Sequence, residues 1–288
     1  MFYDLGILWE WKYDERFVRL VDEFCQRSGK TSYLVWPHNF NESMTKILSG
    51  ELRFRVILDR ATDSDPAFLP IVRLHQEAKS RIINEPEKAT HTYNKALMHL
   101  EFKNGGVNVP NTLILSPNEA YDDKALEVLG RPFVIKPVED EGGGKGVFLG
   151  AKTVHDVERV RKQYPGTQIL IQENIVPGEF DQWRCWFRVF YICGNVIPCF
   201  WDDLTHIYRR LVPEEEMAFS DLKRITEKIQ EIIGLEFFST EIVQTEEGKF
   251  VVVDYVNDQC DMRFQSDTPD GVPDSVVEEI AKAIVETL

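Results

Sequence analysis

The 288-residue sequence is short of positive charge and of long apolar runs. It has 33 Lys and Arg against 48 Asp and Glu, which gives a formal charge of −15. This excess of acid argues against duplex DNA as a partner, because neutralising phosphates needs a basic face. Small anionic ligands are still compatible with the negative net charge, since a chain that is acidic overall can contain a local basic cleft. No run of about 18 uncharged apolar residues is present, so we expect no membrane-spanning helix.

Cysteine is also scarce. The five cysteines are scattered and lack C-x-x-C spacing, so we expect buried thiols in a reducing compartment rather than disulfides or a zinc site. The N-terminus reaches Asp4 without a basic stretch and does not resemble a signal peptide. These features predict a cytoplasmic protein. The six histidines are dispersed and are expected to be ordinary surface or core residues, and Trp183, Trp186 and Trp201 to be core residues.

A composition of 43% hydrophobic and 28% charged residues is typical of a globular protein, and the length suggests two domains. Up to about residue 85, strand patterns (5–9, 32–36, 54–58) alternate with helix patterns (15–26, 41–52, 66–79). This alternation predicts an α/β domain with a parallel sheet over residues 1–85. No G-x-G-x-x-G follows the first strand, so the dinucleotide-binding fingerprint is missing.

Ligands of parallel sheets bind beyond the carboxyl ends of the strands. The residues near such ends are candidate substrate contacts: Trp9, Glu10, Trp11, Asn39, Asp59 and Arg60. The alternative, that these are ordinary polar loops, is the more frequent case.

From about residue 86 the pattern changes to helices mixed with antiparallel hairpins, which predicts a second domain over 86–288. Helices are predicted over 84–105, 118–129 and 153–163, and strands over 109–115, 133–137, 147–149 and 168–175. Further on, 184–201 reads as two strands, and a helix capped by Ser220 stops at Gly234. Strands follow over 237–244 and 249–256, and a capping box of Ser275 and Glu278 opens the last helix.

Lys136 closes the apolar strand pattern 133–137 and needs an anionic partner, because an unpaired buried ammonium group is costly. The partner is either a carboxylate in a salt bridge or a bound phosphate. The segment 139–146 then supplies consecutive glycines, whose backbone can approach an oxyanion closely, and Lys145. A structural glycine-rich turn is the alternative, and no Walker A motif is present.

Two acids lie in apolar strand patterns near the C-terminus. Glu241 falls within 237–243, Asp254 closes the run 251–253, and Asn257 follows three residues later. Acids in such positions need a positive partner, and two carboxylates with an amide oxygen suit Mg²⁺. The alternative is two unrelated acids at strand ends that face solvent.

These features together resemble the ATP-grasp superfamily over residues from about 84 to the end, with a preceding domain of the expected kind. The resemblance implies that Lys95, after Asn94 where Asp is usual, and Lys136 bind the nucleotide. It implies that the loop 142–146, with Gly143, Gly144 and Lys145, covers the phosphates. The segment 171–175 resembles the adenine hinge, with Gln172, Glu173 and Ile175 as contacts. Glu179, seven residues after Gln172, matches the ribose-binding acid.

The resemblance continues in the C-terminal part. It gives Arg188 a catalytic role, and Arg209, or Arg210 beside it, a second one. It makes Glu241, Asp254 and Asn257 the metal ligands, although the spacing from Asp254 to Asn257 is one residue longer than the family's. In a plain strand that spacing puts the two side chains on opposite faces, so a bulge or strand end is needed, or Asp258 shares the role.

The resemblance therefore implies an N-terminal parallel-sheet domain followed by a two-lobed α+β ATP-grasp domain, with lobes over 86–175 and 176–288. It implies ATP and Mg²⁺ as cofactors, with Mn²⁺ as an alternative ion. The expected activity is that of a ligase that activates a carboxylate as an acylphosphate and joins it to an amine. The substrates would be small molecules or peptides, with no nucleic acid or membrane partner, and a homo-oligomer stays open.

Two other functions remain open at this stage. The first is a small-molecule kinase on the same scaffold, which would need no amine. The second is a nucleotide-binding module that binds nucleotide but catalyses no reaction. The acidic composition disfavours a kinase for polyphosphorylated substrates, which needs a denser basic cleft. The extra residue between Asp254 and Asn257 is the feature that favours an inactive module.

Overall fold

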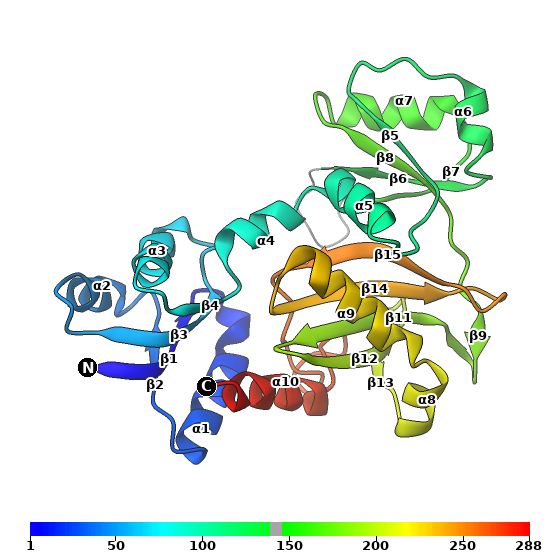
Figure 1. Ribbon diagram of the computed structural model, residues 1–288. Helices are drawn as coiled ribbons and strands as arrows, with labels where there is room; N and C mark the ends of the chain where they lie inside the picture. The colour runs from blue at the N-terminus through cyan, green and yellow to red at the C-terminus, as the bar shows by residue number, and fades with distance from the viewer. Residues whose placement is uncertain (139–145) are drawn as a thin grey trace.

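The N-terminal part of the chain forms a parallel α/β unit (Figure 1). The structure is a computed structural model that describes residues 1–138 and 146–288. Four parallel strands lie in the order β2-β1-β3-β4, which confirms the predicted parallel sheet. The elements are β1 (Phe2–Trp9), η1 (Lys12–Asp14), α1 (Glu15–Arg27), β2 (Ser32–Val35), α2 (Phe40–Leu48), β3 (Arg53–Arg60), η2 (Pro66–Phe68), α3 (Leu69–Glu77) and β4 (Arg81–Ile83).

Two helices, α4 (Pro86–Thr92) and α5 (Lys95–Asn104), lead into a small antiparallel lobe at the upper right of Figure 1. Its strands lie in the order β5-β8-β6-β7. The elements of this small lobe are β5 (Thr112–Leu115), α6 (Asp123–Glu127), β6 (Phe133–Pro137), β7 (Phe148–Ala151), α7 (Val154–Gln163) and β8 (Ile169–Glu173). One face of its sheet packs on α6 and α7 through a core that includes Leu126, Phe133 and Val157.

The C-terminal lobe is built on a five-stranded antiparallel sheet in the order β13-β12-β11-β14-β15. A short hairpin, β9–β10, precedes the sheet. The elements are β9 (Glu179–Phe180), β10 (Trp183–Arg184), β11 (Trp186–Ile192), β12 (Asn195–Trp201), β13 (Tyr208–Arg210), α8 (Pro213–Ala218), α9 (Asp221–Ile233), β14 (Phe237–Gln244), β15 (Phe250–Asn257) and α10 (Asp274–Glu286).

The two faces of this sheet are covered by different helices. On one face, Phe187, Phe200 and Phe238 pack against apolar residues of α5 and α9; we call this the α9 face. On the other, Phe190, Ile197 and their neighbours pack against α1 and α10; we call this the α10 face. Side chains alternate between the faces along each strand, so the strand register decides which residues can meet.

The N-terminal unit and the C-terminal lobe share one hydrophobic core. Residues of β1 and α1 belong to the same buried cluster as β11, β12 and α10, and α10 packs directly on α1. The last helix of the chain therefore covers a face of the first unit, and the predicted boundary near residue 85 does not separate two independent cores. The small lobe has a core of its own, and in Figure 1 it projects away from the rest of the molecule.

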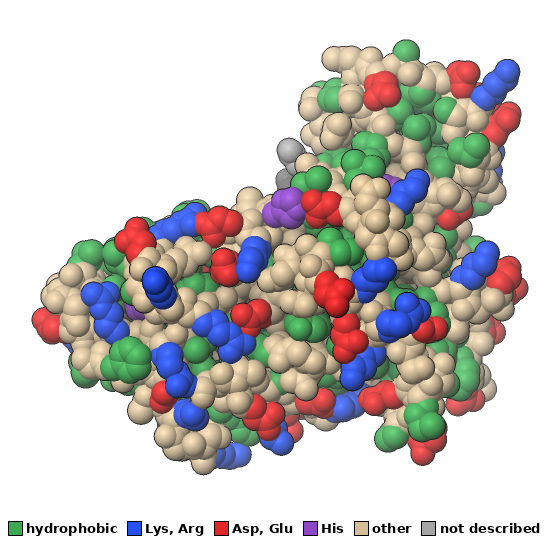
Figure 2. Space-filling view, in the orientation of Figure 1, with side chains coloured by type: hydrophobic (Ala, Val, Ile, Leu, Met, Phe, Trp, Pro, Cys, Tyr) green, Lys and Arg blue, Asp and Glu red, His purple; other side chains and the backbone are tan. Residues whose placement is uncertain are grey.

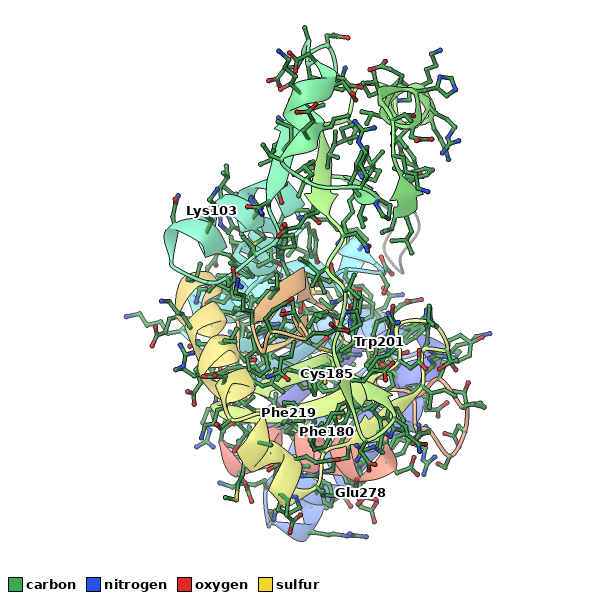
Figure 3. The ribbon with its side chains drawn as sticks, turned by 90° about the vertical axis from the view of Figure 1, so that its right-hand side faces the viewer. Lys103, Phe180, Cys185, Trp201, Phe219 and Glu278 are labelled. Atoms are coloured by element: carbon green, nitrogen blue, oxygen red, sulfur yellow. The ribbon has the colours of Figure 1, made fainter. Side chains whose placement is uncertain are left out.

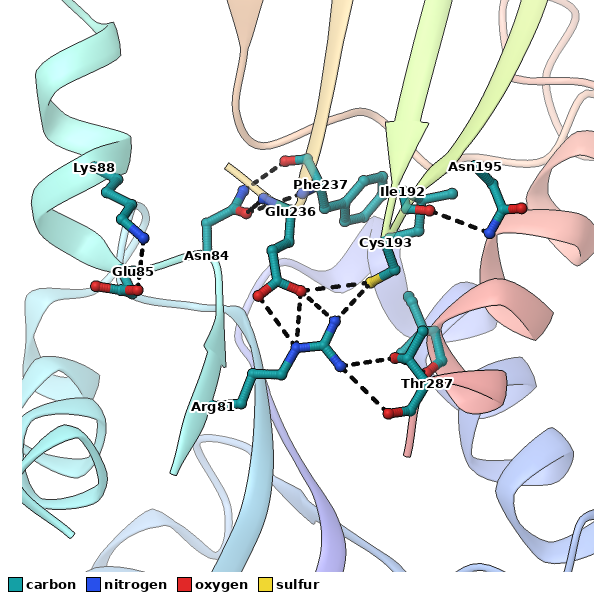
Figure 4. A network of polar contacts seen from close by, with 11 residues as sticks. Arg81, Asn84, Glu85, Lys88, Ile192, Cys193, Asn195, Glu236, Phe237 and Thr287 are labelled. Atoms are coloured by element: carbon teal, nitrogen blue, oxygen red, sulfur yellow. Dashed lines mark hydrogen bonds and ion pairs between the residues drawn. The ribbon is translucent and has the colours of Figure 1, made fainter. Parts of the chain in front are cut away.

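Polar contacts reinforce the junction at the end of β4 (Figure 4). The Arg81 guanidinium binds the Glu236 carboxylate and donates to Thr287 Oγ1 at 3.0 Å. The buried Asn84 side chain accepts from the backbone N–H groups of Glu236 and Phe237 at 2.8 and 2.9 Å. Its amide nitrogen donates to the Phe237 carbonyl and, at 2.7 Å, to Asp258. One side chain thus joins β4 to the start of β14 and to the segment after β15.

Several predicted elements differ from the structure at their ends. The predicted helix 84–105 is two helices, because the Asn94 side chain caps a new one by accepting from Leu97 N at 2.9 Å. The predicted helix 118–129 shortens to α6, because the Asp122 side chain accepts from Ala125 N at 3.0 Å and starts the helix late. The predicted capping box of Ser275 and Glu278 is wrong, since α10 begins at Asp274 after Pro273.

Three features of the structure can be compared with the composition: the surface charge, the cysteines and the length of the apolar helices. On the face shown in Figure 2, acidic and basic side chains are interspersed. The five cysteines are free thiols, four of them buried. Within the ranges that the structure describes, no helix combines the length and apolar character needed to cross a bilayer.

We expect Asn84→Ala to lower the free energy of unfolding by roughly 2–5 kcal/mol, because several buried backbone and side-chain groups lose their hydrogen-bond partner together. Asn195→Ala is the matched control: Asn195 is exposed and its side chain makes one long bond, to the Ile192 carbonyl at 3.4 Å. Its effect should stay within about 0.5 kcal/mol. Urea unfolding of the two variants measures the difference, and equal effects would contradict this account of the junction.

Candidate active site

An acid–arginine row crosses the α10 face of the C-terminal sheet. The register pairs Asp254 with Glu241 and Glu241 with Arg188 across β15, β14 and β11. The three side chains therefore project from the same face on adjacent strands. Figure 3 shows this sheet, with Trp201 of β12 labelled, below the small lobe.

Glu241 is the centre of the row and is only 6% exposed. Arg188 Nη2 donates to Glu241 Oε1, and Trp186 Nε1 donates to Oε2 at 3.0 Å. Burial raises the pKa of Glu241, the Arg188 charge opposes that rise, and nearby Asp254 adds to it. Glu241 is therefore a desolvated carboxylate whose charge depends on the cations around it.

Arg188 is similarly enclosed. Its guanidinium lies 5.1 Å from the centre of the Trp201 ring, and its Nε is buried with no hydrogen-bond partner in the described part of the chain. Burial opposes the charge, but the net direction of the Arg188 pKa is upward because Tyr208, Glu241 and Asp254 lie close by. Arg188 therefore stays cationic and keeps one N–H donor that the described residues do not use.

The structure brings Asp254 and Asn257 together by bulging β15. Between the pairs Glu241–Asp254 and Ser239–Asn257, β14 advances two residues while β15 advances three. The extra residue puts both side chains on the α10 face, and Asn257 Nδ2 donates to Asp254 Oδ2 at 3.1 Å. This is the bulge that the sequence spacing required.

The donor set at the end of the row fits a hard divalent cation. Two carboxylates and the Asn257 amide oxygen are oxygen ligands of the kind that Mg²⁺ takes, alongside waters and phosphate oxygens. Across residues 1–138 and 146–288, no group of three or more His, Cys, Asp or Glu side chains is arranged to hold a metal. A cation here would therefore rely on the amide oxygen as well as on the two acids.

Lys136 reaches the same place from the other lobe. Its Nζ donates to the Val253 carbonyl at 2.8 Å, next to Asp254, and its charge lowers the pKa of Glu241. The apolar strand β6 thus delivers an ammonium group from the small lobe to the acids of the C-terminal lobe. Lys95 is the half-buried first residue of α5, and this helix packs against β15 and β8.

The side chains of the two predicted hinge residues Gln172 and Glu173 bind different parts of the molecule. The Gln172 side chain is 2% exposed and points inward, where its Nε2 donates to Thr112 Oγ1 at 3.0 Å and to the Tyr255 hydroxyl at 2.8 Å. The Glu173 carboxylate instead accepts from Asn111 Nδ2 at 2.8 Å. Glu173 and Ile175 line a cavity of about 490 Å³ that also reaches Val251.

An apolar patch lies beside the hinge on the α10 face. Ile175 and Trp186 pack here against three buried valines of β14 and β15, namely Val243, Val251 and Val253. Trp183, Trp186 and Trp201 are each half-buried and pack against the edge of a hydrophobic cluster, so they are core residues only in part. Trp186 is the most informative of them, because it joins this patch to Glu241.

Three predicted phosphate contacts, Gly143, Gly144 and Lys145, lie outside the described residues. The predicted ribose-binding Glu179 is exposed on β9, where it lies opposite Arg184 of β10 in the strand register. No contact of Glu179 within the described residues joins it to the acid–arginine row.

Arg209 does not lie in the acid–arginine row. The position beside Arg188 that its implied catalytic role requires is therefore not the one that the structure shows. Arg209 pairs with Phe200 in the register and so lies on the α9 face, opposite Arg188. Its guanidinium donates to both oxygens of Glu215 at 2.9 and 2.8 Å. Its neighbour Arg210 is the one that shares the face of Arg188, through Cys199, and it pairs with Glu279 of α10 at 2.5 Å.

Most candidate contacts at the strand ends of the N-terminal unit have structural partners. The Arg60 guanidinium is buried against Asp14 and donates to the Cys260 carbonyl at 2.8 Å. The Asp59 carboxylate accepts from backbone N–H groups of the turn that follows it. Trp9 is buried and stacks on Trp36, with ring centres 5.3 Å apart.

Asn39 likewise closes its own turn, since its side chain accepts from Trp36 N and donates to Leu34 O. Trp11 is 37% exposed and Glu10 is half-buried. Trp11 is therefore the one of the six candidates that is exposed, and Glu10 beside it is partly accessible to a substrate.

Sequence reasoning missed a buried polar chain behind the row. His99 of α5, Tyr255 of β15 and Gln172 of β8 are joined through the Tyr255 hydroxyl, at 2.8 Å on each side. The one sequence signal was the extra residue between Asp254 and Asn257, which falls in the segment where Tyr255 lies. Nothing in the sequence connects this position with His99, 156 residues earlier.

Comparison with solved structures shows that the chain has the ATP-grasp fold. The ATP-grasp ligase PsnB, complexed with precursor peptide PsnA2 and AMPPNP, is 15% identical with a TM-score of 0.64, and the match covers 99% of this chain and 96% of that chain. The macrocyclase MdnC, bound with precursor peptide MdnA from Microcystis aeruginosa, is 14% identical with a TM-score of 0.65, over 99% and 100% of the two chains.

The D-alanine–D-alanine ligase of Bacillus anthracis, complexed with ATP, is 13% identical with a TM-score of 0.64, over 99% and 97% of the chains. At this identity the likeness establishes the fold and leaves the chemistry to the site residues. No family model matches the sequence, and no curated protein matches it.

The His99 environment predicts a pH dependence of stability. Burial, and then the nearby Lys103, lower the pKa of His99 from 6.5 to about 4. Between these values the unfolded chain binds the proton that the folded protein refuses, so this group makes stability fall as the pH drops from about 6.5 to about 4. We expect His99→Gln, which keeps an acceptor for Tyr255 but does not titrate, to flatten this part of the profile.

Urea unfolding at a series of pH values between about 7 and 4.5 measures the effect. The control is His206→Gln, because His206 is exposed, and this variant should keep the wild-type profile. An unchanged slope in His99→Gln would show that another group produces the dependence.

Proposed function

We propose that this protein is an ATP- and Mg²⁺-dependent ligase that activates a carboxylate as an acylphosphate and joins it to an amine, with release of ADP and phosphate. The observation that carries the proposal is the convergence of Lys136, from one lobe, with the row of Asp254, Glu241 and Arg188 from the other. The ATP-grasp fold supports it, because the solved structures that share this fold include PsnB, MdnC and D-alanine–D-alanine ligase.

In this proposal Glu241, Asp254 and Asn257 would hold Mg²⁺, which would supply positive charge to neutralise the nucleotide phosphates. Lys136 and Lys95 bind the nucleotide phosphates, together with the segment that contains Gly143, Gly144 and Lys145. Phosphoryl transfer requires positioning and charge neutralisation more than an enzyme nucleophile. This requirement suits a site rich in lysine, arginine and carboxylate.

Arg188 has a separate role. Its Nε is a buried donor that no described residue accepts, and an anionic group on the α10 face would satisfy it. We assign Arg188 to the transferring phosphoryl group and to the oxyanion that forms when the amine attacks the acylphosphate. The amine attack forms the amide C–N bond and breaks the C–O bond to phosphate, which leaves as inorganic phosphate.

The adenine ring is assigned to the apolar patch beside the hinge. Ile175, Val251 and Val253 supply a surface for an aromatic ring, and the neighbouring cavity of about 490 Å³ is lined by Glu173. Glu179 remains our proposal for the ribose. The substrates are assigned to the strand ends of the N-terminal unit, where Glu10 and Trp11 keep accessible surface.

The substrate class that we favour is a peptide or small molecule with a free carboxylate, joined to an amine. PsnB and MdnC were solved with precursor peptides, and their structures match this chain over nearly its whole length. We also propose that the protein acts in the cytoplasm, in line with its free thiols.

The decisive test is a coupled assay for ADP and phosphate with panels of carboxylates and amines. We expect turnover only when both a carboxylate and an amine are present. A stable phosphorylated product formed without an amine would indicate a kinase. Metal-independent nucleotide binding without turnover would indicate an inactive module.

We expect Glu241→Gln to reduce kcat/KM by at least about 100-fold, since the variant keeps the shape of the side chain but removes the charge that faces the cation. Mg²⁺-dependent binding of ATP should weaken in parallel. Glu286→Gln is the matched control, because Glu286 is exposed and pairs only loosely with Lys282 at 3.5 Å. Full activity of Glu241→Gln would contradict the proposed metal site.

A further inference from the structure

Three side chains form a continuous hydrogen-bonded chain behind the proposed metal site. The Tyr255 oxygen lies 2.8 Å from His99 Nδ1 and 2.8 Å from Gln172 Nε2. Each of the three residues is at most 4% exposed. Tyr255 also packs edge-on against Phe102, with ring centres 5.4 Å apart, so the phenol is held on its apolar part as well as at its hydroxyl.

The direction of the chain follows from the donors and acceptors. His99 stays neutral near pH 7 because burial lowers its pKa. In the tautomer that carries its proton on Nε2, Nδ1 is an acceptor for the Tyr255 O–H, and we assign this tautomer because Gln172 Nε2, on the other side of the hydroxyl, is a donor. The amide nitrogen of Gln172 donates to the Tyr255 oxygen and, with its second hydrogen, to Thr112 Oγ1. The Tyr255 hydroxyl therefore bonds side chains of two other elements, α5 and β8.

Each of these elements carries a residue of the proposed nucleotide site. His99 lies one helical turn after Lys95 on α5, and Gln172 directly precedes Glu173 on β8. Tyr255 directly follows Asp254 on β15. One hydroxyl group thus links α5, β8 and β15 by hydrogen bonds, in addition to the apolar packing that they share.

Tyr255 also belongs to the bulge. The stretch of β15 from Asp254 to Asn257 has one residue more than the paired stretch of β14. Tyr255 turns to the α9 face and anchors there, and this leaves Asp254 and Asn257 together on the α10 face. A bulge is held in place by what its side chains bind, because the ladder itself is interrupted there.

We propose that Tyr255 is a positioning residue whose hydroxyl, held between His99 and Gln172, fixes the β15 bulge so that Asp254 and Asn257 face one Mg²⁺ ion. This inference rests on the proposed function and adds to it a residue that touches neither nucleotide nor metal. It predicts a defect that depends on the cation, which a merely structural role would not produce.

The test is Tyr255→Phe, which removes the hydroxyl and keeps the ring. We expect the affinity for the ATP analogue AMPPNP, measured by calorimetry, to fall about 10-fold with Mg²⁺ and less than about 2-fold in EDTA. The Mg²⁺ concentration for half-maximal binding should rise about 10-fold. Tyr121→Phe is the matched control, because it deletes a half-buried hydroxyl that bonds Glu158 at 3.0 Å in the small lobe, away from the site.

Two variants of His99 keep the inference testable if Tyr255→Phe does not fold. His99→Gln retains an acceptor for the Tyr255 O–H and should bind AMPPNP with Mg²⁺ within about 2-fold of wild type. His99→Leu removes the acceptor and should reproduce the Mg²⁺-specific loss. A double variant with Tyr255→Phe should lose nothing more, because both changes break the same chain.

The outcomes separate the two claims. If wild type binds Mg²⁺–AMPPNP and Tyr255→Phe binds it equally well with the same stability loss as Tyr121→Phe, Tyr255 is only structural and this inference is overturned. A loss of equal size in EDTA would also overturn it, since the bulge would then act on the nucleotide and not on the ion. If wild type binds no nucleotide at all, the proposed function itself falls.

Discussion

The buried ion pair between Arg188 and Glu241 is the constraint on which the site depends. Both groups lie on strands in the middle of the C-terminal sheet, and each would be costly to bury alone. Removing one partner of such a pair typically costs about 3–5 kcal/mol, because the other charge stays desolvated. Asp254 adds a second carboxylate beside the pair, and Lys136 supplies the compensating charge from the small lobe. The two lobes are therefore coupled electrostatically where the phosphates are proposed to bind.

The architecture explains how such a site is kept in place. The N-terminal unit and the C-terminal lobe share a core through α1 and α10, and Arg81 and Asn84 add polar contacts at the same junction. The small lobe has an additional core of its own. It meets the C-terminal lobe through α5 and through Val138 and Leu170, which share a buried apolar cluster with Phe238 and Val252, as well as through the polar contacts of Lys136 and Gln172. Apolar packing therefore holds the two lobes together, and the polar contacts of Lys136 and Gln172 lie at the same junction, next to the proposed cation site.

The strand register separates residues that the sequence had grouped. Arg209 and Arg210 are adjacent in the chain, yet they lie on opposite faces of the sheet at β13. Arg209 binds Glu215 of α8, while Arg210 lies on the same face as Arg188. The same alternation would have separated Asp254 from Asn257, and the bulge in β15 reverses that outcome. The aromatic Trp186, whose sequence context indicated only apolar packing, turns out to orient Glu241 through its ring nitrogen.

Local sequence pattern determined the order and type of most elements, because strand and helix periodicities depend on which neighbouring residues are apolar. It also determined which residue types could serve a phosphate or a cation: Lys136 at the end of an apolar strand, and Glu241 and Asp254 within two others. The tertiary structure alone decided which of these meet. The face of Arg209, the bulge at Asp254 and the bond from His99 to Tyr255 depend on pairing between strands and helices far apart in the chain. A periodicity carries no record of such pairing, since register and long-range packing are properties of the folded sheet.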